Sequence, residues 1–207
     1  MEKHDVPGWY IWSCEKIKYM FPKAHAAAYV MMAWRIAYCK IHYPLAYYGA
    51  FFTIRAKAFS YDIMCQGREH LESIMKTYKR RMDAAADKEE GAQPLSNREE
   101  AAYSDMRVVQ EMYARGYEFM PIDIFRAHSR NFQIIDGKLM PSINSIEGLG
   151  EKAADAIVEA AKNGPFLSKD DFRERTKVSK TAVEMLDSLK LLGDIPESNQ
   201  LSLFDFF

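Results

Sequence analysis

Two glycines separated by one residue, Gly148 and Gly150, form the part of this sequence best suited to bind a phosphate. They flank Leu149 between two stretches with helical periodicity, which predicts a tight turn that leads into a helix. Glycine allows the positive φ of such a turn and leaves the backbone N–H groups uncovered. These groups would lie at a helix N-terminus beside Lys152, where the helix dipole favours an anion. The turn is therefore a candidate contact for a nucleic-acid backbone; the alternative is a packing turn that binds nothing.

A second helix–turn–helix pattern follows, with one helix opening at 166–168 and the next spanning 181–192. Its turn at 176–180 lacks glycine, so we interpret it as the degenerate half of a tandem pair. Lys177 and Lys180 can still reach a phosphate from this turn. Residues 141–181 contain seven basic and seven acidic side chains. Because this part of the chain is neutral, we expect modest, salt-sensitive binding that depends on tethering to something larger.

The last eight residues of the chain place five large apolar side chains behind a polar stretch. They are Leu201, Leu203, Phe204, Phe206 and Phe207. A chain end normally frays, and leaving these side chains in water forgoes about 1.5–3 kcal/mol for each one that could be buried. We therefore expect this tail either to fold back onto its own domain or to enter an apolar pocket of a partner.

The order of residues in this tail is similar to a known binding peptide. Gln200, Leu201, Ser202, Leu203 and Phe204 resemble the short segment by which bacterial replication and repair proteins bind the ring-shaped sliding clamp. The resemblance implies that Gln200 forms a hydrogen bond at the rim of the clamp's pocket. It also implies that Leu203 and Phe204 fill an apolar groove there.

Lys23 and His25 stand at the start of a predicted apolar helix. A cation and an imidazole beside free backbone N–H groups suit a phosphate. The alternative is that both are exposed polar residues at the end of a buried helix. Chemistry alone favours that alternative.

Composition limits the classes of protein to which the chain can belong. It has 207 residues, of which 48% are hydrophobic and 28% charged, with a net charge of −1, as expected for a globular protein without general affinity for polyanions.

The start of the chain is charged and lacks a signal peptide. The apolar run 26–41 is too short for a membrane span and carries Arg35 and Lys40, so we predict a buried helix and no membrane association. Cys14, Cys39 and Cys65 are predicted to be buried free thiols in a reducing cytoplasm.

Apolar periodicity and proline positions predict mainly helices. We expect a short helix carrying Trp9 and Trp12 that ends before Phe21, buried helices over 23 to about 42 and from Pro44 onward, and an amphipathic helix over 61 to about 86. After a linker at 87–96, Ser96 and Glu99 are spaced as a capping box for a helix that ends near Arg115. Short strands are expected at 122–125 and 132–135, and Asp136-Gly137 predicts a hairpin leading to 138–140.

These elements predict a mainly α fold with four parts. A helical domain would span 1–116, a strand-containing linker 117–141, a tandem helix-hairpin-helix domain 142–196 and an extended tail 197–207. The third part rests on a resemblance to the helix-hairpin-helix motif. The matching positions are Ile146, Gly148, Leu149, Gly150, Ala153, Ala156 and Ile157, with Glu147 where the motif usually has proline.

The segment Phe-Pro-Lys-Ala-His-Ala-Ala-Ala-Tyr at 21–29, followed by His-Tyr-Pro-Leu at 42–45 and Tyr47-Tyr48, resembles the fingers region of C-family replicative DNA polymerases. The resemblance is closest to the PolC type of DNA polymerase III. It implies a C-terminal piece of such an enzyme, with Lys23 and His25 on the nucleotide or template side. It also implies a primer-template duplex, dNTP, a sliding clamp and other replisome subunits as partners at the nucleoid. The catalytic aspartates and two Mg²⁺ ions would lie in an upstream palm, so the chain alone should be inactive and hold no cofactor.

Two other functions remain open at this stage. One is a non-catalytic DNA-binding adaptor that recruits the sliding clamp, although the aromatic start at 9–12 argues against a separate protein. The other is a structural helical module without DNA contact.

Overall fold

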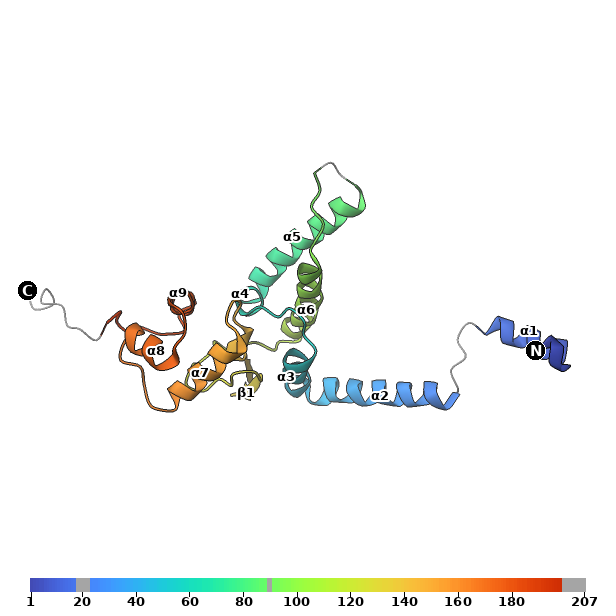
Figure 1. The fold of residues 1–207 in the computed structure, drawn as a ribbon, viewed down its shortest axis with the longest axis horizontal. Coiled ribbons are helices and arrows are strands. Elements are labelled where there is room, and N and C mark those ends of the chain that lie inside the picture. The colour runs from blue at the N-terminus through green and yellow to red at the C-terminus, as the bar shows by residue number, and fades with distance from the viewer. Residues whose placement is uncertain (18–22, 89–90, 199–207) are drawn as a thin grey trace, which may run out of the picture. The chain divides into compact units, whose positions relative to one another are not determined.

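The computed structural model describes residues 1–17, 23–88 and 91–198 and is dominated by helices (Figure 1). The chain divides into two compact units, Met1–Tyr43 and Pro44–Phe207. The two-stranded hairpin in the second unit is the only sheet in the described residues. A mainly α fold is therefore confirmed.

The first unit consists of η1 (Glu2–His4), α1 (Gly8–Lys16) and α2 (Lys23–His42). The helix expected from residue 23 is present, but its predicted burial is wrong, because neither α1 nor α2 has a buried side chain. Trp9 is 72% exposed and Trp34 is 74% exposed. Apolar side chains surround α2, so burying it would require neighbours on several sides. Cys39 on this helix is exposed rather than buried, whereas Cys14 and Cys65 are partly buried.

The second unit begins with four helices, α3 (Pro44–Ile54), α4 (Tyr61–Met64), α5 (Arg68–Ala86) and α6 (Asn97–Ala114). The single helix expected over 61–86 is in fact two, because Gly67 adopts a φ of +96° that interrupts it. Helices α5 and α6 pack side by side (Figure 1). Their shared core contains the fully buried side chains of Tyr48, Leu71 and Met106.

The start of α6 is a capping box, as predicted. The Ser96 hydroxyl accepts a hydrogen bond from the Glu99 N–H at 3.3 Å, and the Glu99 carboxylate accepts one from the Ser96 N–H at 2.8 Å. The Arg81 guanidinium of α5 donates to the same carboxylate at 2.5 Å. The Glu99 carboxylate therefore caps α6 and also links it to α5 through Arg81.

The linker between α3 and α4 is held by a buried carboxylate. Asp105 of α6 accepts hydrogen bonds from the N–H groups of Lys57 and Ala58, both at 2.8 Å. The Asp105 side chain lies in the core, so these bonds give the linker a fixed path and leave the Lys57 side chain exposed.

A β-hairpin joins the two helical parts of this unit. Strands β1 (Gln133–Ile135) and β2 (Lys138–Met140) pair through a turn at Asp136 and Gly137, whose φ values are +50° and +75°. This confirms the predicted hairpin, since two consecutive positive φ values define its favoured turn. The strand expected at 122–125 is absent, because the Asp123 carboxylate accepts a bond from the Phe125 N–H at 2.9 Å and bends the chain into a turn.

The remaining elements are η2 (Ile143–Ser145), α7 (Glu151–Ala161), α8 (Lys169–Thr176) and α9 (Lys180–Ser188). They share a second core in which Ile157, Phe172 and Leu186 are fully buried. Arg175 joins α8 to α7 by donating to the carbonyls of Ala160 and Gly164 at 2.5 and 3.0 Å. Across the described ranges, no helix combines the length and apolar character needed to cross a membrane.

The cap of α6 leads to a pH-dependent prediction. Hydrogen bonds from Arg81 and Ser96 lower the pKa of Glu99 from 4.5 to about 2. A carboxyl with a lowered folded-state pKa stabilises the fold above its unfolded-state pKa and loses this effect as the pH falls through the folded-state value. We expect Glu99→Gln to lower the thermal midpoint at neutral pH, and the deficit to shrink as the pH falls from about 4.5 toward about 2. The matched control is Glu100→Gln, in the same turn but outside the capping box; a deficit independent of pH would contradict the assignment.

Candidate nucleic-acid interface

The first glycine turn has the geometry of an exposed backbone loop anchored by one buried side chain. Gly148 has a φ of +84° and is exposed, whereas Leu149 is only 6% exposed and lies in the second core. Gly150 is the N-cap of α7, and its carbonyl accepts bonds from the N–H groups of Ala153 and Ala154, both at 3.0 Å. The N–H groups of the first two residues of α7 precede these bonds and point out of the helix end. The arrangement can receive an anion.

The element before this turn differs from the expected helix. It is η2, a single turn of 3-10 helix, whose Ile143 carbonyl accepts a bond from the Ile146 N–H at 3.2 Å. The Ser145 hydroxyl donates to the Ser142 carbonyl at 2.6 Å, which closes this tight turn. The glycine turn at 148–150 thus lies between the single turn of η2 and the helix α7.

The second turn repeats the backbone plan of the first without a glycine. Lys177 occupies the left-handed region with a φ of +57°, Val178 is 7% exposed and lies in the core, and Ser179 is the N-cap of α9. These three residues correspond in conformation and burial to Gly148, Leu149 and Gly150. The pair is therefore a tandem of two similar turns, each with a buried apolar residue between exposed backbone.

The helix that lies between the two turns has no open N-terminus. The N–H groups of Lys169 and Asp170 donate to the carbonyls of Pro196 and Glu197, at 2.8 and 3.1 Å. The Lys169 ammonium also pairs with Asp187 at 2.8 Å and with Glu197 at 2.5 Å. The chain returning from α9 thus covers the start of α8, so the starts of α7 and α9 are the better candidates for an external anion.

The acidic residues beside the first turn are paired with arginines from outside it. Glu147 pairs with Arg98 of α6 at 2.7 Å, and Glu151 pairs with Arg130 at 3.4 Å. Arg130 also donates to Asp155 at 2.6 Å, and this hydrogen bond lowers the pKa of the Asp155 carboxyl. These exposed pairs are weak, so the arginines can be shared with a phosphate. The pairs also balance the negative charge that Glu147 and Glu151 would otherwise present there.

The contact of the predicted interface lysines with a phosphate stays a prediction. Lys152, Lys177 and Lys180 are all exposed, and Lys180 pairs with Glu184 one helical turn away at 3.6 Å. Arg98 and Arg130 were not predicted. Their approach to the turn depends on contacts between residues far apart in the chain, for which the sequence carries no local signal.

Lys23 and His25 lie in the first turn of α2 and are exposed. The His25 ring contacts the Tyr29 ring, with their centroids 4.5 Å apart. Both residues belong to the first unit, and their assignment to a nucleotide or template stays a prediction. The predicted clamp-binding residues Gln200–Phe204 lie outside the described residues. Within the described ranges, no group of three or more histidine, cysteine, aspartate or glutamate side chains is placed to hold a metal ion.

Comparisons with known proteins agree with this geometry. A family described as a helix-hairpin-helix motif matches residues 116–200. The chain is 50% identical over 205 residues to the PolC-type DNA polymerase III of Bacillus cereus, and 47% identical over 204 residues to that of Caldanaerobacter subterraneus. A Streptococcus agalactiae relative of the same name is 47% identical over 209 residues. These alignments cover 99–100% of this chain but only 14% of each relative, so the chain spans about one seventh of their length.

The first turn provides a stability test with an internal control. Leu149→Ala removes a buried side chain and should lower the free energy of unfolding by about 2–5 kcal/mol. Gly148→Ala places a side chain at a φ of +84° and should cost about 1–2 kcal/mol. Gly150→Ala should cost about 0.5–1 kcal/mol, because φ is −74° there and no atom lies within 4 Å of the added Cβ, so that only the preference for glycine over alanine at an N-cap is lost. Denaturant unfolding measures all three; equal losses for the two glycines would be inconsistent with this turn.

Proposed function

The chain belongs to the PolC-type DNA polymerase III family, and on this basis we propose that it is the C-terminal part of a replicative DNA-directed DNA polymerase. In this proposal it contributes part of the fingers, binds the backbone of the primer-template duplex and tethers the enzyme to the sliding clamp. The observation that carries the proposal is the tandem of similar turns at 147–151 and 176–180. Both turns bury one apolar residue and present backbone N–H groups at a helix start.

Duplex binding would use backbone groups at both turns. The N–H groups of Glu151 and Lys152 would receive one phosphate at the start of α7, and the start of α9 would receive another. Lys177 and Lys180 would add positive charge at the second turn. Such contacts are independent of base sequence, as a replicative enzyme requires when it moves along DNA.

The chemistry of the intact enzyme would take place beside this chain. Lys23 and His25 would lie on the side where the nucleotide and the template enter. Nucleotidyl transfer from a dNTP to the primer 3′-hydroxyl uses two Mg²⁺ ions, which we assign to carboxylates elsewhere in the longer protein. We therefore expect no polymerisation by this chain alone. The site of action would be the cytoplasmic nucleoid.

The tail would hold the enzyme at its template. Binding of Gln200, Leu203 and Phe204 to a ring that encircles DNA would convert duplex binding into an effectively intramolecular event. Modest affinity at the two turns would then suffice, which fits the equal numbers of basic and acidic residues at 141–181.

The duplex assignment can be tested with the glycine that is conformationally free. We expect Gly150→Ala to fold normally and to weaken binding of a labelled blunt DNA duplex, because the added methyl group blocks close approach of a phosphate. Lys177→Ala should reduce the slope of log Kd against log salt by about 0.9, the value for one lost phosphate contact. The control is Lys162→Ala, at the far end of α7. Duplex affinity unchanged in both Gly150→Ala and Lys177→Ala would exclude this surface as the duplex site.

The tail assignment can be tested by binding to a purified bacterial sliding clamp. The double variant Leu203→Ala, Phe204→Ala should weaken binding by about tenfold or more, as expected from losing two buried apolar side chains. The chain ending at Ser198 should lose binding to the same extent. The matched control is Asn199→Ala, which changes the residue just before the proposed binding peptide and should leave the affinity unchanged. Equal affinity of the shortened and complete chains would overturn the assignment.

A further inference from the structure

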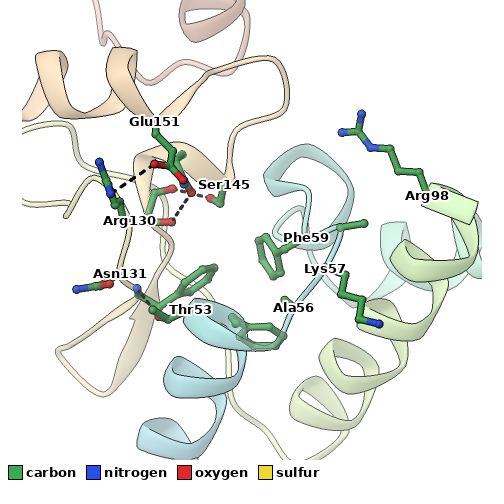
Figure 2. A pocket seen from close by; sticks show the side chains of 14 residues that line it. Thr53, Ala56, Lys57, Phe59, Arg98, Arg130, Asn131, Ser145 and Glu151 are labelled. Carbon is green, nitrogen blue, oxygen red and sulfur yellow. Dashed lines mark hydrogen bonds and ion pairs between the residues drawn. The ribbon is translucent and has the colours of Figure 1, made fainter.

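A polar groove lies beside Glu151, the first residue of α7 (Figure 2). Its other lining residues belong to α3, the α3–α4 linker, α6 and the segments 130–132 and 142–145. Its volume is about 580 Å³. Figure 2 shows Lys57 and Arg98 on one side of the open space, with Arg130 and Asn131 on the other and Phe59 facing it from the centre. The side chains thus come from the α3–α4 linker, the start of α6 and the segment before β1.

The charge on this groove differs from the charge of the whole chain. Three of its lining side chains are cationic (Lys57, Arg98 and Arg130) and one, Glu151, is acidic, whereas the chain as a whole has a net charge of −1. In the described part of the chain no ion pair is found for Lys57, and the two arginine side chains are 73% and 52% exposed. A polyanion would compete for these arginines with exposed carboxylates, which hold them weakly.

The inner surface of the groove is aromatic. Phe59 is partly buried and packs against Phe52 and Phe132, with ring centroids 5.1 and 5.0 Å apart. Cationic side chains around a supported aromatic ring are the combination by which proteins hold unpaired nucleic-acid strands, with bases stacked on the ring and phosphates at the cations. The volume admits nucleotide-sized groups but not a duplex.

We propose that this groove binds an unpaired DNA strand that continues from the duplex held at the first turn. Glu151 is both a lining residue of the groove and the first residue of α7, so the two surfaces are continuous. Arg98 connects them as well, through its pair with Glu147. The proposal rests on the proposed duplex-binding function and adds a site for single-stranded DNA. Together the two surfaces would recognise a junction between paired and unpaired DNA.

A strand, rather than a free nucleotide, is favoured by the placement of the charges. The three cations come from separate segments on both sides of the groove and do not converge on one point, as they would for a triphosphate (Figure 2). A strand carries several phosphates, so that each cation could meet a different one. A free nucleotide is therefore the competing ligand that the experiment must distinguish.

The test measures binding of the whole 207-residue chain to a labelled oligothymidylate of about 12 nucleotides, a length within the usual site sizes, and to a blunt duplex. Phe59→Leu should weaken oligothymidylate binding by about fivefold or more through lost stacking. Lys57→Ala should lower the salt slope for the single strand by about 0.7. Both variants should bind the duplex within about twofold of the unmodified chain, and Lys162→Ala, at the far end of α7, should leave both affinities unchanged.

The possible outcomes separate this inference from the proposed function. A chain that binds the duplex but not the oligothymidylate would refute the groove site and leave the duplex site standing. A chain that binds neither would refute both. Equal losses of single-strand and duplex binding in Phe59→Leu and Lys57→Ala would also refute the groove site. Displacement of the oligothymidylate by thymidine triphosphate at equal nucleotide concentration would reassign the groove to a free nucleotide.

Discussion

The burial of one apolar side chain between two exposed backbone positions is the constraint on which the candidate interface depends. Leu149 and Val178 enter the second core and thereby fix the turns on either side of them. In both turns the residue before the buried side chain lies in the left-handed region, and the residue after it is the N-cap of a helix. The second core therefore determines the position of exposed backbone N–H groups that are not part of it. The anchors of both turns share one core with Phe172 and Leu186.

The charges beside the first turn are arranged in pairs of opposite sign. Glu147 and Glu151 would repel a phosphate if they stood alone, but Arg98 and Arg130 pair with them from other segments. Ion pairs on an exposed surface contribute little stability and exchange partners readily. A polyanion can therefore gain the arginines without a large cost to the fold. Net charge is a poor guide to such a surface, because the distribution of charge matters more than its sum.

Local patterns in the sequence predicted those features that depend on local geometry. The capping box at Ser96 and Glu99, the hairpin turn at Asp136 and the glycine turn at Gly148 each follow from a few adjacent residues. The interruption at Gly67 was missed because a single glycine in an amphipathic pattern does not by itself end a helix. The exposure of α2 was missed because periodicity shows that a helix has apolar surface but not whether this chain covers it. The arginines at the candidate interface join segments about 20–50 residues apart, beyond the reach of any local pattern.

The closed start of α8 has a mechanical consequence for the end of the chain. Pro196 and Glu197 are bonded to the first N–H groups of α8, and Glu197 also pairs with Lys169. Only three peptide units separate Glu197 from Gln200, and a fully extended chain gains at most about 3.6 Å per residue. Covalent geometry alone thus keeps the start of the proposed clamp-binding segment within about 11 Å of Glu197. The bonds of Pro196 and Glu197 to α8 therefore tie the chain that leads to this tail to the same core that carries the two turns.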